Sequence, residues 1–236
     1  MELLEQGALG LGLRLTAGQL EQFEAYYREL ADWNRQVNLT AVIERREVQV
    51  KHFLDSLTLY SVCTGGPAAG LRVVDVGAGA GFPGLPLKLA LPEIHLTLVE
   101  SAGKKTRFLG HLINLLGLSG VDVLTGRSEE LAHEVELRES FDLAVSRGVA
   151  KLPVLLEYTL PYCQVGGRAA LLKRNVQREI GGASNALEAL GGRMGDIHPV
   201  QLPGLDDGRV IVTVDKVAAT PDRYPRRPGM PVKRPL

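Results

Sequence analysis

One stretch constrains the fold of this chain more than any other, namely Val73-Val74-Asp75-Val76-Gly77-Ala78-Gly79-Ala80-Gly81-Phe82-Pro83-Gly84. Its β-branched start predicts a buried strand, and the leucines that follow it predict a helix that begins near Pro83. The intervening glycines leave backbone N–H groups uncovered at the helix N-terminus. The stretch therefore predicts a strand, a tight turn and a helix that together bind a nucleotide-like ligand.

Three kinds of glycine-rich loop compete for this stretch. A phosphate-binding P-loop needs a Gly-Lys-Ser/Thr ending, which is missing here. A dinucleotide fingerprint can be laid on Gly79, Gly81 and Gly84, but three glycines in six residues arise easily. The better match is acidic-x-Gly-x-Gly-x-Gly from Asp75, which resembles the first motif of class I S-adenosylmethionine (SAM) methyltransferases.

A second anchor follows one strand later. Residues Ile94–Val99 alternate as a strand does, and Glu100 stands at its end. A carboxylate at this place can accept hydrogen bonds from both ribose hydroxyls of NAD or of SAM. Glu100 therefore indicates a nucleoside ligand but does not distinguish NAD from SAM. The alternative interpretation of Glu100 is a solvated charge at a strand end.

Composition sets wider limits. The 236 residues suit one domain with a small accessory element, and the formal net charge of zero argues against a uniformly basic nucleic-acid binder. Cys63 and Cys163 are too few and too far apart for a metal site, and buried hydrophobic positions suit them better. With acids at the N-terminus and no long apolar run, we expect a cytoplasmic protein without a membrane span.

The first 65 residues are expected to form an N-terminal helical cap. Thr16 and Gln19 suit a capping box ahead of a helix that reaches about Trp33, and a second helix is expected from Glu44 to about Val62. Residues 1–15 are left open between a short helix and a mobile arm. On the second helix His52 and Ser56, and Lys51 and Asp55, have i,i+4 spacing. Spacing alone favours a surface Lys51–Asp55 salt bridge and a partly buried histidine.

Residues 66–218 are expected to form the SAM-binding domain, after a linker at Gly65–Gly70. Strands and helices alternate there, which indicates a parallel sheet with helices on both faces. Helices are expected over Ser128–Arg138, Leu152–Cys163 and Gln177–Leu190. Two extended segments, Arg193–Leu202 and Arg209–Val217, follow without a helix between them and should pair as an antiparallel hairpin. A parallel sheet closed in this way is the Rossmann-like α/β topology of class I methyltransferases.

The remaining residues, 219–236, are the C-terminal arm. From Arg223 onward it has five positive charges and no acid, and its prolines favour an extended form. Such an arm, with Tyr224 among the arginines, can contact phosphates and stack on a base, although a disordered solubilising tail is the alternative. Deleting Tyr224–Leu236 is then expected to weaken RNA binding and to spare SAM binding.

Taken as a set, these motifs resemble the RsmG family, also called GidB, the bacterial 16S ribosomal RNA guanine-N7 methyltransferases. The resemblance runs from about Trp33 to Leu236. It rests on five groups of residues: Trp33-Asn34 with Asn38-Leu39-Thr40, His52 with Leu54-Asp55-Ser56, Asp75–Gly84, Ser146-Arg147 with Val149-Ala150, and Tyr224-Pro225-Arg226-Arg227-Pro228-Gly229. It implies methylation, with SAM as cofactor, of one guanine N7 in the 530 loop of 16S rRNA, and a link to streptomycin resistance. The partner would be 16S rRNA or the small ribosomal subunit, and the protein a monomer.

The resemblance also implies roles for particular residues. Those expected to bind the cofactor are Asp75, Gly77, Gly79, Phe82, Glu100, Ser101, Ala102, Ser128, Glu129 and Arg147. Arg147 and Lys173, at strand ends, are expected to bind RNA phosphates or the guanine O6 edge and so to carry catalysis. His52 and Asp55 are expected at the rim of the pocket, where they contact RNA or close over SAM, and Tyr224, Arg226 and Arg227 are expected to contact RNA. The sequence departs from the family pattern at Gly148 and Arg174.

Several alternatives stay open at this stage. Arg147 could instead form a salt bridge to Asp142 or Glu157. An NAD-dependent oxidoreductase is the competing enzyme, although the terminal hairpin and Asp75 count against it. A non-catalytic RNA-binding protein that keeps the SAM-type fold is the competing binding module.

Overall fold

A seven-stranded sheet forms the centre of the molecule, with strand order β3-β2-β1-β4-β5-β7-β6. The computed structural model describes residues 1–63, 70–205 and 207–236. The strands are β1 (Arg72–Val76), β2 (His95–Glu100), β3 (Val121–Thr125), β4 (Phe141–Arg147), β5 (Cys163–Arg174), β6 (Gly192–Pro199) and β7 (Arg209–Lys216). Strands β1 to β5 pair in parallel, whereas β7 runs antiparallel to both β5 and β6. The predicted terminal hairpin is therefore confirmed.

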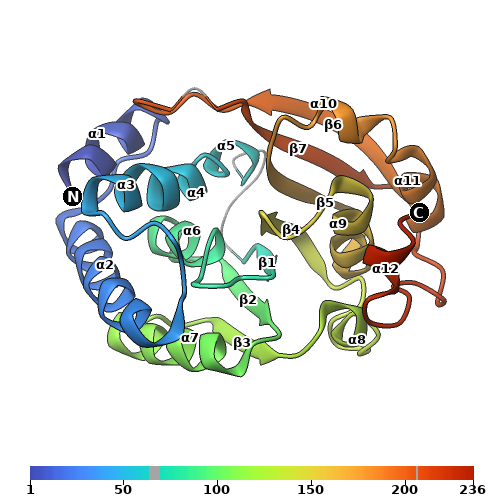
Figure 1. Cartoon of the computed structure of the whole chain (residues 1–236), viewed down its shortest axis with the longest axis horizontal. Helices are drawn as coiled ribbons and strands as arrows, with labels where there is room; N and C mark the ends of the chain where they lie inside the picture. The colour runs from blue at the N-terminus through green and yellow to red at the C-terminus, as the bar shows by residue number, and fades with distance from the viewer. Residues whose placement is uncertain (64–69, 206) are drawn as a thin grey trace.

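Helices cover both faces of this sheet (Figure 1). They are α1 (Glu2–Gly10), α2 (Ala17–Val37), α3 (Arg45–Val48), α4 (Asp55–Leu57), α5 (Tyr60–Cys63), α6 (Gly84–Ala90), α7 (Gly103–Leu115), α8 (Ser128–Leu131), α9 (Leu152–Thr159), α10 (Gln177–Ile180), α11 (Ser184–Leu190) and α12 (Met230–Lys233), with a π-helix η1 (Gln49–Leu54) and a 3₁₀ turn η2 (Leu160–Tyr162). Among the described residues, no helix is both long and apolar enough to cross a membrane.

The strands are apolar on both sides because each face of the sheet has its own core. In β1, Val73 belongs to the core under α2, α6 and α7, whereas Val74 belongs to the core under α9 and α11. The same alternation places Leu143 and Ala144 of β4 in opposite cores. The first of these cores also contains the buried side chains of the N-terminal helices, so these helices and the sheet share one hydrophobic interior.

Several local predictions are confirmed. Thr16 Oγ1 accepts a hydrogen bond from Gln19 N, and Gln19 Oε1 accepts one from Thr16 N, which is the expected capping box. Residues 1–15 do contain a helix, α1. Cys63 and Cys163 are free and buried. The predicted linker at residues 65–70 falls, apart from Gly70, outside the described residues, as does Asp206 in the hairpin turn.

The helix predicted from Glu44 to Val62 is confirmed in part. Residues 45–57 are helical throughout as α3, η1 and α4, with a π-helix at the centre, and α5 follows after a turn. The wider turn of a π-helix changes which residues stand above one another. As a result the predicted Lys51–Asp55 salt bridge does not form, because Lys51 pairs with Glu47 and Asp55 points into the protein.

Three other helices are shorter than predicted. The helix at 128–138 ends at Leu131, because residues 132–140 form turns whose His133 and Arg138 side chains bind the C-terminal arm. The helix at 152–163 becomes a 3₁₀ turn at Leu160–Tyr162, where Pro161 removes a backbone donor. The helix at 177–190 is interrupted at Gly181-Gly182, since glycine loses the most conformational freedom in a helix.

Candidate active site

The glycine loop lies at the carboxyl end of β1 and needs glycine for steric reasons. Gly77 has a φ of 76°, in the left-handed region, and a Cβ added there would lie 2.6 Å from Cγ2 of Val149. The chain therefore passes the loop after β4 too closely for any side chain at this position. The prediction that the loop amides are uncovered is wrong for both Gly77 and Gly79, because Gly77 N donates to Val99 O at 2.9 Å and Gly79 N donates to the Glu100 side chain.

Glu100 holds this loop in place. Its Oε2 accepts a hydrogen bond of 2.9 Å from Gly79 N, and its Oε1 accepts one of 2.8 Å from Ala102 N. The carboxylate thereby ties the glycine loop to the turn that begins α7, although it still lines the cavity. Ala102 is not part of the cavity wall, so its predicted contact with the cofactor is replaced by this backbone support of Glu100.

Asp75 lies beneath the loop, and its predicted contact with the cofactor is wrong. The side chain is fully buried, and its Oδ2 accepts a hydrogen bond of 2.8 Å from Gly84 N at the start of α6. Burial raises the pKa of this carboxyl to about 7, and among the described residues its Oδ1 has no hydrogen-bond partner. Asp75 therefore supports the helix N-terminus below the cavity floor.

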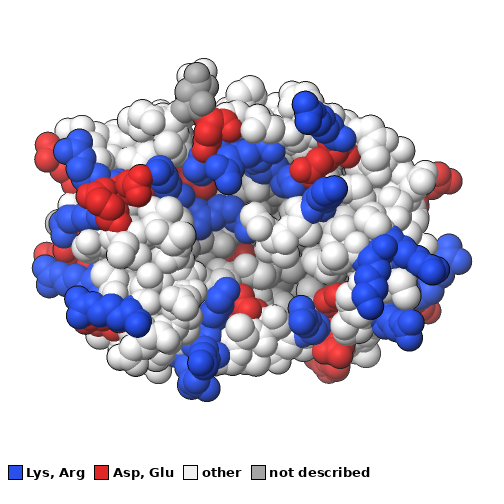
Figure 2. Space-filling model, in the orientation of Figure 1, with Lys and Arg blue, Asp and Glu red and all other residues white. Residues whose placement is uncertain are grey.

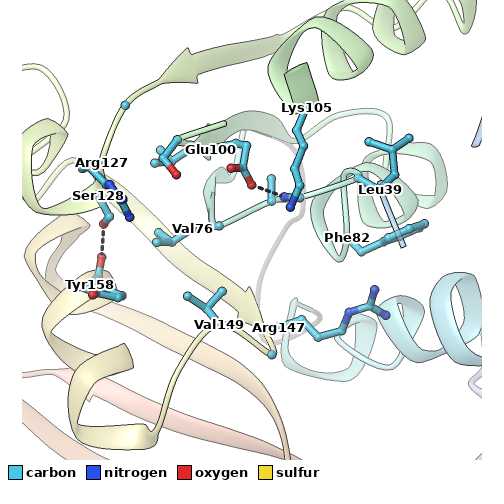
Figure 3. A pocket seen from close by; sticks show the side chains of 18 of the residues that line it. Leu39, Val76, Phe82, Glu100, Lys105, Arg127, Ser128, Arg147, Val149 and Tyr158 are labelled. Carbon is cyan, nitrogen blue, oxygen red and sulfur yellow. Dashed lines mark hydrogen bonds between the residues drawn. The ribbon is translucent and has the colours of Figure 1, made fainter. Parts of the chain in front are cut away.

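A cavity of about 390 Å³ opens above the loop (Figure 3). The predicted cofactor residues that line it are Gly77, Gly79, Phe82, Glu100, Ser101, Ser128, Glu129 and Arg147. Lys105, Val149 and Tyr158 also line it and were missed, because nothing in their local sequence separates them from ordinary helix and loop residues. A glycine loop without side chains, a carboxylate at the end of β2 and a partly apolar wall suit a nucleoside with an amino-acid tail, so these residues fit SAM.

A second cavity of about 860 Å³ adjoins the first and shares His52 and Arg147 with it. Among its charged lining residues the cations outnumber the acids: Lys51, Arg147, Lys151, Lys173, Arg174 and Arg209 face Asp55, Glu179 and Asp207. Figure 2 shows blue side chains around the hollow in the middle of this face of the molecule. This cationic basin gives the protein a local positive field despite its zero net charge.

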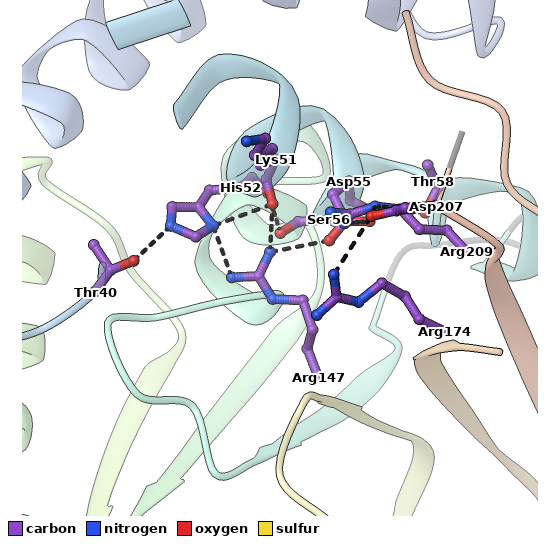
Figure 4. Close-up of polar contacts among 10 residues, drawn as sticks. All are labelled: Thr40, Lys51, His52, Asp55, Ser56, Thr58, Arg147, Arg174, Asp207 and Arg209. Carbon is purple, nitrogen blue, oxygen red and sulfur yellow. Dashed lines mark hydrogen bonds and ion pairs between the residues drawn. The ribbon is translucent and has the colours of Figure 1, made fainter. Parts of the chain in front are cut away.

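Asp55 joins the two sides of the basin (Figure 4). The side chain is 2% exposed, its Oδ2 lies 3.0 Å from Nη1 of Arg147, and its Oδ1 lies 2.7 Å from Nη1 of Arg209. Arg209 also contacts Asp207. This buried geometry does not favour the predicted direct contact of Asp55 with RNA. The carboxylate instead fixes the two guanidinium groups.

His52 holds Arg147 from a second direction. The Arg147 Nη2 group lies 3.1 Å from His52 Nδ1, which also lies 3.1 Å from the Lys51 carbonyl oxygen, and His52 Nε2 lies 2.8 Å from Thr40 Oγ1. Burial, and then the charge of Arg147, lower the pKa of His52 to about 3, which keeps the ring neutral near pH 7. Both side chains lie against Phe82, with the His52 ring centroid at 4.5 Å and the Arg147 guanidinium at 4.9 Å.

Lys173 lines the basin but is already engaged. Its Nζ is 2.8 Å from Glu179 Oε2 and donates to Ala150 O at 2.8 Å, and the side chain is 9% exposed. The alternative salt bridges weighed for Arg147 are wrong, because Glu157 pairs with Arg226 and Asp142 binds Arg72 N and Gln164.

The C-terminal arm differs most from its prediction. Tyr224 is buried, and Arg226 forms an ion pair with the fully buried Glu157. The buried Tyr224 ring is not available to stack on a base, so that predicted contact is wrong. The Arg226 side chain is 24% exposed, and its predicted RNA contact stays a prediction. Arg227 is exposed, and its predicted RNA contact stays a prediction.

This fold and cavity define a class I, Rossmann-like SAM-dependent methyltransferase. Two solved structures share the fold: M. jannaschii TYW2 in complex with AdoMet (TM-score 0.52, 19% identity, covering 68% of this chain and 74% of that one), and a mutant of MtNAS in complex with S-adenosylmethionine (TM-score 0.55, 17% identity, 92% and 77%). The antiparallel β7 and β6 separate this fold from the all-parallel dinucleotide-binding sheet.

Sequence comparison identifies the family. The model of the GidB family, described as rRNA small subunit methyltransferase G, matches residues 19–201. Proteins named ribosomal RNA small subunit methyltransferase G from Dehalococcoides mccartyi strain CBDB1 and Roseiflexus castenholzii are 46% and 44% identical, over the full length of both chains. The chain belongs to the GidB family, and it is a methyltransferase whose methyl donor is SAM.

Proposed function

We propose that this protein transfers the methyl group of SAM to N7 of one guanine in the 530 loop of 16S rRNA. One structural observation is the main support for this proposal. Arg147 and His52 stand where the cofactor-sized cavity and the cationic basin meet. A nucleoside cofactor in the first and an RNA strand along the second would bring a base to the shared wall. Family membership supports the choice of ribosomal RNA as the substrate.

The cofactor residues each contribute one part of the binding. When bound, SAM supplies an electrophilic methyl group on a sulfonium centre. The glycine loop at Gly77 and Gly79 has no side chain to block the tail of the ligand, and the Glu100 carboxylate suits the ribose hydroxyls. Ser128 and Glu129, after β3, lie where the adenine would sit. The Phe82 ring and the Arg147 guanidinium form the wall closest to the basin.

Arg147 is the residue that we place at the acceptor base. Guanine N7 is a free lone pair, so the transfer needs no strong base and depends mainly on positioning. A guanidinium can donate to O6 of guanine, next to N7, and so orient the base. Asp55, His52 and the face of Phe82 hold this guanidinium in one place, with its side chain 18% exposed. Positioning of this kind is worth several kcal/mol of the barrier, on the order of 7 to 11 at most.

The cationic basin would hold the flanking RNA. Lys51, Lys151 and Arg174 line it, and phosphate contacts of this type make affinity fall with salt. Lys173 would take part only if its pair with Glu179 opened, so we give it a supporting place. We expect the protein to act as a monomer on free 16S rRNA or on the small subunit.

Methyl transfer from labelled SAM to 16S rRNA that lacks the modification tests the proposal. The assay is run on free RNA and on 30S particles, and borohydride–aniline cleavage then locates any N7-methylguanine. We expect a single cleavage in the 530 loop. Incorporation elsewhere, or none despite SAM binding, would refute the proposed target.

A substitution of Arg147 tests its proposed role separately. Arg147→Ala should reduce kcat/KM for RNA by at least about a hundredfold, because the base loses its orienting donor. Arg35→Ala removes an arginine that is 78% exposed and outside both cavities, and it should act like the wild type. Full transfer by Arg147→Ala at limiting RNA would contradict the assignment.

A further inference from the structure

The C-terminal arm docks on the elements that form the adenine end of the cofactor cavity. In Figure 1, α12 lies beside α8 and α9, which contribute Ser128, Glu129 and Tyr158 to the cavity wall. Contacts between α12 and α9 place these elements together. The arm is thus a neighbour of the cofactor site, at the opposite end from Arg147.

The first part of the arm is anchored firmly. Thr220 N donates to Glu139 Oε1, and Lys216, which is almost fully buried, reaches both Glu139 and Thr220 Oγ1. Arg138 donates to Tyr224 O at 2.9 Å, and His133 Nε2 lies 2.8 Å from Pro225 O. These contacts account for the turns that replace the predicted helix after Leu131.

The centre of the arm is anchored by a buried ion pair. Glu157 is 0% exposed, and it accepts hydrogen bonds from the backbone N, Nε and Nη2 of Arg226. An unpaired carboxylate at this depth would be costly, so Arg226 must remain docked for α9 to keep its place. Glu157 directly precedes Tyr158, a residue of the cavity wall.

The last contact reaches the site itself. Gly229 N donates a 3.0 Å hydrogen bond to Glu129 Oε1 across one hundred residues of sequence. Glu129 is 4% exposed and lines the cofactor cavity. Tyr158 lies in the same wall, where burial and then the nearby charge of Glu129 raise the pKa of the tyrosine to about 12. The carboxylate is therefore held from behind by the arm and lies beside Tyr158 of α9.

We propose that the C-terminal arm is a positioning element for SAM, acting through the hydrogen bond from Gly229 N to Glu129. Residues 229–236 hold the Glu129 carboxylate, and with it the start of α8, in the conformation that binds the adenine end of the cofactor. The arm thus sets cofactor affinity, in contrast to the sequence-based expectation that its deletion spares SAM binding.

Two truncated chains test the proposal by calorimetric titration with SAM. A chain ending at Pro228 keeps the Arg226–Glu157 ion pair but lacks the Gly229 donor, and its Kd should rise about tenfold. A chain ending at Arg234 keeps Gly229 and α12, and its Kd should stay within about twofold of wild type. Hydrogen exchange without SAM should speed up at Ser128–Leu131 only in the shorter chain.

A matched pair of glycine variants repeats the test in the full-length chain. Gly229 has a φ of 78° and Gly12 a φ of 77°, and a Cβ added at either meets nothing within 4 Å. Both Gly229→Ala and Gly12→Ala therefore impose the same left-handed strain. Only Gly229→Ala should weaken SAM binding, by about threefold, because relief of its strain moves the amide away from Glu129.

A double-mutant cycle separates this role from a general loss of stability. In a Glu129→Ala background, truncation after Pro228 should change the Kd by less than about twofold, since the arm has lost its target. An unchanged Kd in the single truncation would overturn the proposal. An equal loss with and without Glu129 would also overturn it, because the arm would then act through the fold as a whole.

Discussion

Asp55 is the carboxylate on which the two guanidinium groups of the basin depend, and its replacement gives the sharpest test of the site. Asp55→Asn keeps the shape of the side chain and removes only the charge, 3.0 Å from Arg147 and 2.7 Å from Arg209. Arg209 retains Asp207 as a partner, but within the described part of the chain Arg147 retains no carboxylate. Breaking a buried pair while leaving its partner charged costs about 3 to 5 kcal/mol.

Urea unfolding measures this cost. With a slope of about 2 to 3 kcal/mol/M, the midpoint of Asp55→Asn should fall by about 1 to 2.5 M. Arg209→Gln should cost less, about 1 to 2 kcal/mol, because Asp55 then still has Arg147. Asp32→Asn, in a surface pair whose aspartate is 67% exposed, is the control and should cost below about 0.5 kcal/mol. A midpoint for Asp55→Asn within about 0.2 M of wild type would refute the reasoning, as would a smaller loss than that of Arg209→Gln.

Three further predictions concern the cofactor side of the site. Gly77→Ala should weaken SAM binding at least about tenfold in a titration, because the added Cβ would meet Val149 at 2.6 Å and φ is 76°, whereas Gly10→Ala, with open space around its Cβ, should bind normally. The folded pKa of Asp75 is raised to about 7, so ionisation of this carboxyl destabilises the protein as pH rises. Asp75→Asn should therefore gain stability relative to wild type between about pH 4 and pH 7, by up to about 4 kcal/mol. A difference in unfolding free energy that stays constant with pH in urea titrations would contradict this. The folded pKa of His52 is lowered to about 3, so the stability that the neutral ring contributes is present above about pH 6.5 and is lost on acidification. His52→Gln should therefore lose less stability than wild type between pH 6.5 and 4. Parallel curves of unfolding free energy against pH would show that burial of this ring is not the cause.

Most of the fold could be predicted from the sequence because the relevant signals are local. The strand, glycine turn and helix around Asp75–Gly84 depend on neighbouring residues, and the absence of a helix between the last two extended segments was enough to predict the hairpin. The errors in the helices have local causes of another kind. A π-helix at Gln49–Leu54 has no clear mark in the hydrophobic period, and it turned Asp55 from a surface position to the interior.

The candidate site was predicted unevenly for the same reason. Eight of the predicted cofactor residues do line one cavity, because they follow successive parallel strands whose carboxyl ends meet at one edge. Arg209 and Lys105 were missed, since each is one basic residue among many until the chain folds. The basic, proline-rich composition of the C-terminal arm predicts an extended segment that is exposed to solvent or RNA. That composition does not reveal that Glu157 lies buried opposite Arg226.

By itself, the sequence determined that this chain folds as an α/β methyltransferase domain, and it predicted that a nucleoside binds at the end of β1. Those properties follow from the hydrophobic period, the conformational freedom of glycine and the succession of strands and helices along the chain, all of which can be recognised over short stretches. Only the tertiary structure decided what surrounds that nucleoside. Asp55 meets Arg147 across 92 residues of chain, and Glu129 meets Gly229 across 100. Charges and donors so distant in sequence are brought together by packing on a shared sheet, and burial then gives their contacts the strength to hold a site.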